Sequence, residues 1–242
     1  MKKLFLSWFA LTLALFTPAA NAQQGMKIVV FGDNMTSGYQ LQENEAYAGK
    51  LYYRLRDIGY EAVSVVGMSE TGRTTSSALQ SIDKVLMQRP DIVILQLGFN
   101  DVIRGANTDI VYNNIVDIAG KLQQRGIFVI LFGISAPDTA DPVYTRQLQA
   151  VYQKIADFYR TPFYPDILQG IRGNQEFMLA DSKHPNGKGI DIMVENTFRM
   201  VDAGLRWKWD RINEQRGFDP QNKVALPPAM PPMAEPEPLP PR

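Results

Sequence analysis

The sequence contains no cysteine and only one histidine, His184. Without cysteine, the chain can form neither disulfide bonds nor thiolate metal sites. Acidic and basic residues number 25 each, so the chain lacks the excess positive charge that marks nucleic-acid-binding proteins. After residue 22 no apolar run reaches the length of about 18 residues that predicts a membrane span. We therefore expect a mature chain with no transmembrane segment, stabilised by its hydrophobic core alone.

Residues 1–22 have the pattern of a secretory signal peptide. Two lysines near the N-terminus precede an apolar run over residues 4–16, and Ala20-Asn21-Ala22 forms a cleavage site of small residues. The apolar run is shorter than the roughly 20 residues that a membrane-spanning helix needs. The sequence therefore predicts export, to the periplasm or out of the cell, with removal of this segment.

Residues 217–242 form a proline-rich tail, in which half of the residues from position 227 onwards are proline. Such a composition cannot build a packed core and favours extended conformations. We expect a disordered or semi-rigid tail, either without a partner or docking its proline pairs into an aromatic groove of another protein. The remaining residues, 23–216, have the length of one domain.

Within this domain, short apolar runs alternate with amphipathic helical patterns, which indicates βαβ units and a parallel sheet. The apolar runs lack alternation, as expected for strands that are covered on both faces. We predict a three-layer α/β/α sandwich with about five parallel strands. The predicted strands are 26–31, 61–66, 91–97, 127–132 and 163–164, and the predicted helices are 46–58, 74–88, 109–124, 142–159 and 190–209.

Polar residues follow the predicted strands, at the sheet edge where ligands bind in open parallel sheets. Asp181 lies three residues before His184, and its carboxylate can orient the imidazole and stabilise the imidazolium. A surface histidine before a helix-starting proline would give the same pattern. Gly72 and Asn100 are each ordinary loop residues, but together a backbone N–H and a side-chain amide can hold an oxyanion.

Four segments in this order resemble the sequence blocks of the SGNH (GDSL) hydrolase family. They are GDNM at 32–35, Gly72 within ETGRTT, GFND at 98–101 and DSKHP at 181–185. The resemblance covers residues 26–200 and is closest to the bacterial periplasmic thioesterase, arylesterase and lysophospholipase subgroup. It implies a flavodoxin-like α/β fold and acyl ester, thioester or lysophospholipid substrates, and it implies no metal or organic cofactor.

The resemblance also implies a role for each residue of the site. His184 would be the general base, and Asp181 would orient it. The Gly72 N–H and the Asn100 side chain would form two arms of an oxyanion hole. The backbone N–H of Asn34 would form the third, at the position where the family carries its nucleophile.

At that position family members carry serine, whereas this chain carries Asn34. A carboxamide nitrogen is far less nucleophilic than an activated serine, so activity is expected to be weak or lost. Activity could persist through a displaced hydroxyl of Thr36 or Ser37, through water activated by His184, or after deamidation of Asn34, which the bulky Met35 would slow. The alternative is an inactive relative, a pseudoenzyme that binds an acyl or glycan ligand.

Overall fold

The computed structural model describes residues 25–136 and 141–215. The predicted signal peptide, 1–22, and the predicted tail, 217–242, lie outside the described residues. The described chain contains a parallel five-stranded sheet in the order β2-β1-β3-β4-β5. The strands are β1 (Met26–Gly32), β2 (Val63–Gly67), β3 (Ile92–Gln96), β4 (Phe128–Phe132) and β5 (Phe163–Tyr164).

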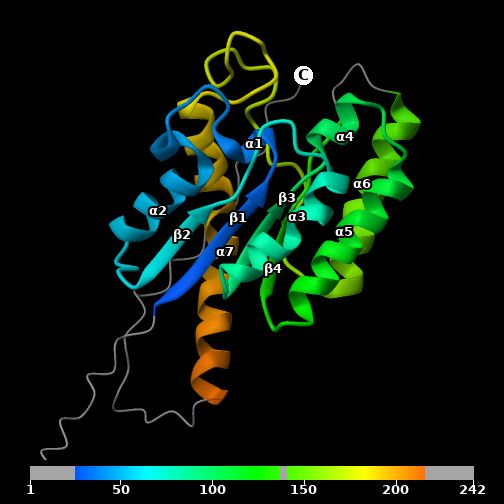
Figure 1. The fold of residues 1–242 in the computed structure, drawn as a ribbon. Helices are drawn as coiled ribbons and strands as arrows, with labels where there is room; N and C mark the ends of the chain where they lie inside the picture. The colour runs from blue at the N-terminus through cyan, green and yellow to red at the C-terminus, as the bar shows by residue number, and fades with distance from the viewer. Residues whose placement is uncertain (1–24, 137–140, 216–242) are drawn as a thin grey trace, which may run out of the picture.

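The helices cover both faces of this sheet (Figure 1). Helices α2 and α7 contact each other on one face, while α3, α5 and α6 pack in sequence on the other. The three-layer α/β/α prediction is therefore confirmed. The helices are α1 (Asn34–Ser37), the 3-10 helix η1 (Glu43–Glu45), α2 (Tyr47–Asp57), α3 (Thr75–Met87), α4 (Phe99–Ile103), α5 (Thr108–Gln123), α6 (Pro142–Tyr159) and α7 (Gly187–Gln215).

Helices α3, α5 and α6 begin where a side chain satisfies their first N–H groups. The Thr74 hydroxyl accepts from the Ser77 N–H at the start of α3. Asp141 accepts from the N–H groups of Val143 and Tyr144, with proline at the first position of α6. The long helices match their predicted ranges to within one or two residues, except at α7.

The structure differs from the prediction in its short helices and in its last helix. Helices α1, η1 and α4 were not predicted, because three to five residues are too few for a periodic pattern. Helix α7 begins at Gly187 and continues to Gln215, beyond the predicted range 190–209. Among the described residues no helix has both the length and the apolar character needed to cross a membrane.

From β1 the chain passes to β2 on one side and then crosses back to β3 on the other side of β1. The connections that leave β1 and β3 therefore run in opposite directions, and ligands bind at such a point in open parallel sheets. The last residues of the two strands, Gly32 and Gln96, are register partners. The segments that follow them carry Asn34 and Asn100.

Candidate active site

Four separate segments bring the predicted site residues together at the carboxyl edge of the sheet. Asn34 opens α1 directly after β1, and Gly72 lies in the loop after β2. Asn100 lies in α4 after β3, while Asp181 and His184 belong to the loop before α7. All five residues are linked by hydrogen bonds, so the structure unites every residue that the sequence analysis assigned to the site.

The Asn34 carboxamide lies at the centre of this cluster and is largely buried. Its Oδ1 accepts two hydrogen bonds of 2.7 Å, from the Gly72 backbone N–H and from Asn100 Nδ2. A backbone N–H can only donate, so the atom facing Gly72 must be the amide oxygen. The amide nitrogen, Nδ2, therefore faces His184 and lies 2.9 Å from its Nε2.

The hydrogen bonds of His184 define its tautomer. Because the amide N–H of Asn34 donates to Nε2, this nitrogen is unprotonated and the ring proton is on Nδ1. Nδ1 lies 2.6 Å from Asp181 Oδ2. Burial alone would raise the pKa of Asp181, but hydrogen bonds from the His184 ring and from two backbone N–H groups hold it below its ordinary value. The imidazole is thus oriented by a carboxylate, as a general base requires.

Two aromatic rings enclose the imidazole. The Tyr39 ring centroid lies 4.2 Å from that of His184, and the Phe99 ring lies 5.4 Å away in an edge-on arrangement. The sequence analysis missed both residues, because one aromatic residue after a glycine has no distinctive signal. Their packing leaves little of the His184 surface exposed.

Asp33 holds α1 against α4. Its Oδ1 accepts from the Met35 N–H at 3.1 Å, and its Oδ2 accepts from the Phe99 N–H at 2.9 Å. Full burial raises the pKa of Asp33 to about 6, although these N–H groups act in the opposite direction. One buried carboxyl group therefore fixes both α1, which carries Asn34, and α4, which carries Asn100.

Arg73 supports the loop that carries Gly72, and the sequence analysis did not identify it. Its guanidinium donates to the carbonyl oxygens of Gly32 and Met68 and to the Glu70 carboxylate. Its own carbonyl accepts the second N–H of Asn100 Nδ2 at 2.8 Å. Arg73 thus connects the end of β1 to the Asn100 side chain, which a sequence pattern alone does not show.

The two hydroxyls considered as displaced nucleophiles have partners other than His184. The Ser37 Oγ lies 3.3 Å from the hydroxyl of Thr71 and 3.4 Å from the carbonyl oxygen of Asn34. The Thr36 Oγ1 lies 2.8 Å from the hydroxyl of Ser69 and donates to Gln96. In this arrangement neither hydroxyl is hydrogen-bonded to the imidazole, so neither is placed as a nucleophile.

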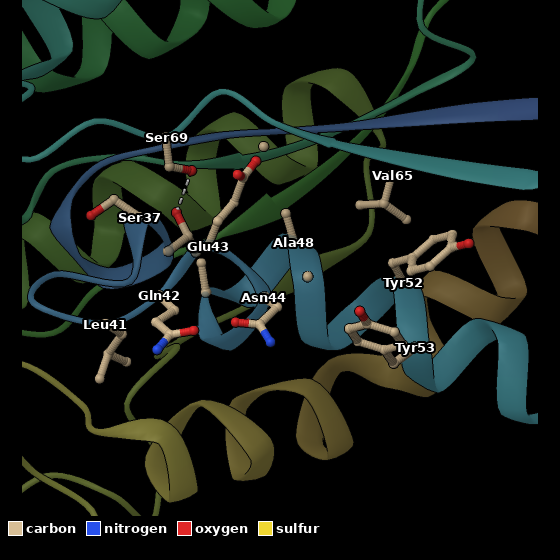
Figure 2. A pocket seen from close by; sticks show the side chains of 14 residues that line it. Ser37, Leu41, Gln42, Glu43, Asn44, Ala48, Tyr52, Tyr53, Val65 and Ser69 are labelled. Carbon is tan, nitrogen blue, oxygen red and sulfur yellow. Dashed lines mark hydrogen bonds between the residues drawn. The ribbon is translucent and has the colours of Figure 1, made fainter.

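A cavity of about 810 Å³ opens beside α1, between α2 and the end of β2. Figure 2 shows Ser37 and Ser69 at one end of it and Tyr52 and Tyr53 of α2 at the other. Its lining combines aromatic rings with hydroxyl and amide groups. Among the described residues no group of three or more His, Asp or Glu side chains could hold a metal ion.

Comparison with known proteins yields several matches. A family model described as GDSL-like lipase/acylhydrolase matches residues 30–192. The esterase TesA of Pseudomonas aeruginosa is 32% identical over 199 residues, which cover 82% of this chain and 96% of that protein. An arylesterase of Vibrio mimicus is 28% identical over 187 residues, or 76% of this chain and 93% of that protein. A crystal structure of TesA, at 29% identity, gives a TM-score of 0.71 and covers 74% of this chain and 99% of that chain.

Proposed function

The chain belongs to the GDSL-like lipase/acylhydrolase family, and on that premise we propose that it has an ester-hydrolase active site blocked by its own Asn34. In the proposed roles, His184 is the base that Asp181 orients, and Gly72 and Asn100 supply oxyanion donors. Asn34 occupies the nucleophile position. The observation that supports this proposal is the set of three hydrogen bonds that the Asn34 amide makes to Gly72, Asn100 and His184.

Asn34 weakens catalysis in two ways. A carboxamide nitrogen does not act as a nucleophile, and loss of the serine leaves only the residual catalysis of binding and the oxyanion hole. In addition, Oδ1 already occupies the two donors that a substrate carbonyl oxygen would need. Losing one such donor lowers turnover by about 10²–10³-fold in related chemistry, so an occupied oxyanion hole compounds the loss of the nucleophile.

The test is the hydrolysis of p-nitrophenyl butyrate and of a short acyl thioester by three forms of the protein. The wild-type chain should turn over barely above background, while Asn34→Ser should gain at least about 10²-fold. The double variant Asn34→Ser, His184→Ala should lose this gain, because the new serine would have no base. A wild-type rate equal to that of Asn34→Ser would overturn the proposal.

A second candidate function is binding without turnover, of an acyl or glycan ligand. The cavity beside α1 favours it, because Tyr52 and Tyr53 provide ring surfaces while Gln42 and Asn44 provide amide groups. Thermal-shift titration with octanoate and with chitooligosaccharides would test this, with Tyr53→Ala as the variant expected to lose the response. A melting temperature that is unchanged with every ligand would count against a binding role.

We further propose that residues 1–22 direct export, that the hydrolase-type domain spans 23–216, and that the tail 217–242 is a separate segment. The signal-peptide pattern and the proline content support these assignments. Cell fractionation with N-terminal sequencing of the mature protein tests the first, with Gln23 as the expected first residue. A pull-down with and without residues 217–242 tests whether the tail recruits a protein partner.

A further inference from the structure

We propose that Asn34 is a modification site, in which the active site hydrolyses the Asn34 side-chain amide to an aspartate and releases ammonia. This inference rests on the proposed function, since it requires His184, Gly72 and Asn100 to form a working hydrolytic centre. The substrate is the side-chain amide of Asn34 itself, so each protein molecule reacts only once. Nothing but water is consumed.

The geometry that carries this inference is the orientation of the amide. Its oxygen accepts from both proposed oxyanion donors, Gly72 N–H and Asn100 Nδ2, at 2.7 Å each. Its nitrogen lies 2.9 Å from His184 Nε2, the atom that would deliver a proton to a leaving group. The carbonyl oxygen and leaving nitrogen therefore face the groups that would face them in a bound amide substrate.

The reaction is a two-step hydrolysis. Water attacks Cγ of Asn34 and gives its proton to His184 Nε2, while the carbonyl electron pair moves onto Oδ1. The Gly72 and Asn100 donors stabilise this oxyanion, and the Asp181 carboxylate stabilises the imidazolium. The electron pair then returns to the carbonyl, the Cγ–Nδ2 bond breaks, and Nε2 protonates the leaving nitrogen. The new carboxyl group passes its proton to ammonia, so water and an amide become a carboxylate and ammonium.

The ordinary route of asparagine deamidation is restrained here. That route requires the backbone nitrogen of Met35 to attack Cγ and form a cyclic imide. The Met35 N–H instead donates to Asp33 Oδ1 at 3.1 Å, and Asn34 is the first residue of helix α1. Attack by water through His184 yields aspartate only, whereas the imide opens to a mixture with isoaspartate. The identity of the product thus distinguishes the two routes.

The experiment follows residue 34 in the purified full chain during prolonged incubation at neutral pH in heavy-oxygen water. Tryptic cleavage after Lys27 and Lys50 isolates Asn34 together with Asn44, so the second asparagine is an internal control. Fragment spectra should show position 34 converted to aspartate with one heavy oxygen atom and no isoaspartate, with Asn44 lagging behind. The His184→Ala variant should convert about 10²-fold more slowly, the contribution expected of a general base.

Several results would overturn the inference. It fails if position 34 keeps its amide while Asn44 converts, if isoaspartate forms, or if His184→Ala and Asn100→Ala convert at the wild-type rate. His184→Gln, checked for a cooperative thermal transition, serves if the alanine variant does not fold. If Asn34→Ser hydrolyses esters but Asn34 stays intact, only this inference fails. If Asn34→Ser is inert, the proposed function fails.

Discussion

The side-chain nitrogen of Asn34 lies 2.9 Å from Nε2 of His184, so an amide is the hydrogen-bond partner of the only imidazole in the chain. A serine in the same place would accept or donate through one hydroxyl and leave the oxyanion donors open. The carboxamide instead reaches both the base and the donors, because its oxygen and nitrogen lie on opposite branches of one planar group. In the proposed function, Asn34 therefore accounts for both the absent nucleophile and the occupied oxyanion hole.

Removing the carboxamide should open the oxyanion hole to a ligand. We expect Asn34→Ala to bind octanoate roughly 30-fold more tightly than the wild-type chain, because the carboxylate would take over two N–H donors worth about 1 kcal/mol each. Isothermal titration calorimetry measures this affinity. Asn196→Ala is the matched control, since it removes an exposed carboxamide that donates to the carbonyl oxygen of Gln169, outside the site. Equal affinities in the wild-type chain and Asn34→Ala would show that Asn34 does not occupy the ligand position.

The tautomer of His184 can be checked directly, because one histidine gives one set of imidazole signals. In the neutral imidazole we expect the proton on Nδ1 rather than on Nε2 in long-range proton–nitrogen correlation spectra, since Nδ1 faces Asp181 and Nε2 faces an amide N–H. Asp181→Asn should weaken this preference. Asp191→Asn, at an exposed carboxylate paired with Lys50, should leave the spectrum unchanged. A proton on Nε2 in the wild-type chain would contradict the arrangement.

The sequence predicts the sheet and the long helices because apolar runs and helical periodicity are local signals. The structure adds Thr74 and Asp141 as the residues that cap the starts of α3 and α6. Topology places the segments that carry Asn34, Gly72 and Asn100 at one edge, because parallel strands end there. The assignment of these residues and His184 to one site comes from the resemblance to the SGNH family, since periodicity and topology leave ordinary roles open for each of them.

Other features depend on contacts between distant residues and could not be predicted. Arg73 reaches the carbonyl of Gly32 across 41 positions, and Tyr39 lies against His184 from another loop. The plane and rotation of the Asn34 amide also follow from three partners on three segments. The resemblance predicts that a serine is replaced, but the sequence does not reveal that the Asn34 oxygen accepts hydrogen bonds from Gly72 and Asn100.

Asp33 should make the stability depend on pH. Its pKa in the folded protein is raised from 3.8 to about 6, so its stabilising contribution is present below pH 3.8 and is lost as the pH rises through about 6. The full rise corresponds to about 3 kcal/mol as an upper limit. In urea unfolding, the stability of the wild-type chain relative to Asp33→Asn should fall between pH 4 and pH 7. Asp109→Asn, at an exposed carboxylate, is the control, and a difference independent of pH would refute the prediction.

Gly98, which directly precedes the helix that carries Asn100, should tolerate no side chain. Its φ is +120°, and a Cβ there would lie 2.1 Å from the hydroxyl of Tyr152. That hydroxyl is fixed by a 2.7 Å hydrogen bond to the carbonyl of Leu97, so it cannot move away cheaply. We expect Gly98→Ala to lower the free energy of unfolding by about 3 kcal/mol or more, through backbone strain and overpacking together.

The matched control for that substitution is Gly105, just beyond the other end of the same short helix. Its φ is +63°, but a Cβ there meets no atom within 4 Å. Gly105→Ala should therefore cost only the left-handed backbone strain, about 1 kcal/mol. Chemical denaturation of both variants separates the cost of backbone strain from the cost of the clash with the Tyr152 hydroxyl. In the Asn34→Ser background, Gly98→Ala should also lower ester turnover, because a shifted α4 would displace the Asn100 donor. Equal stability losses at the two glycines would mean that the contact with Tyr152 does not constrain the site.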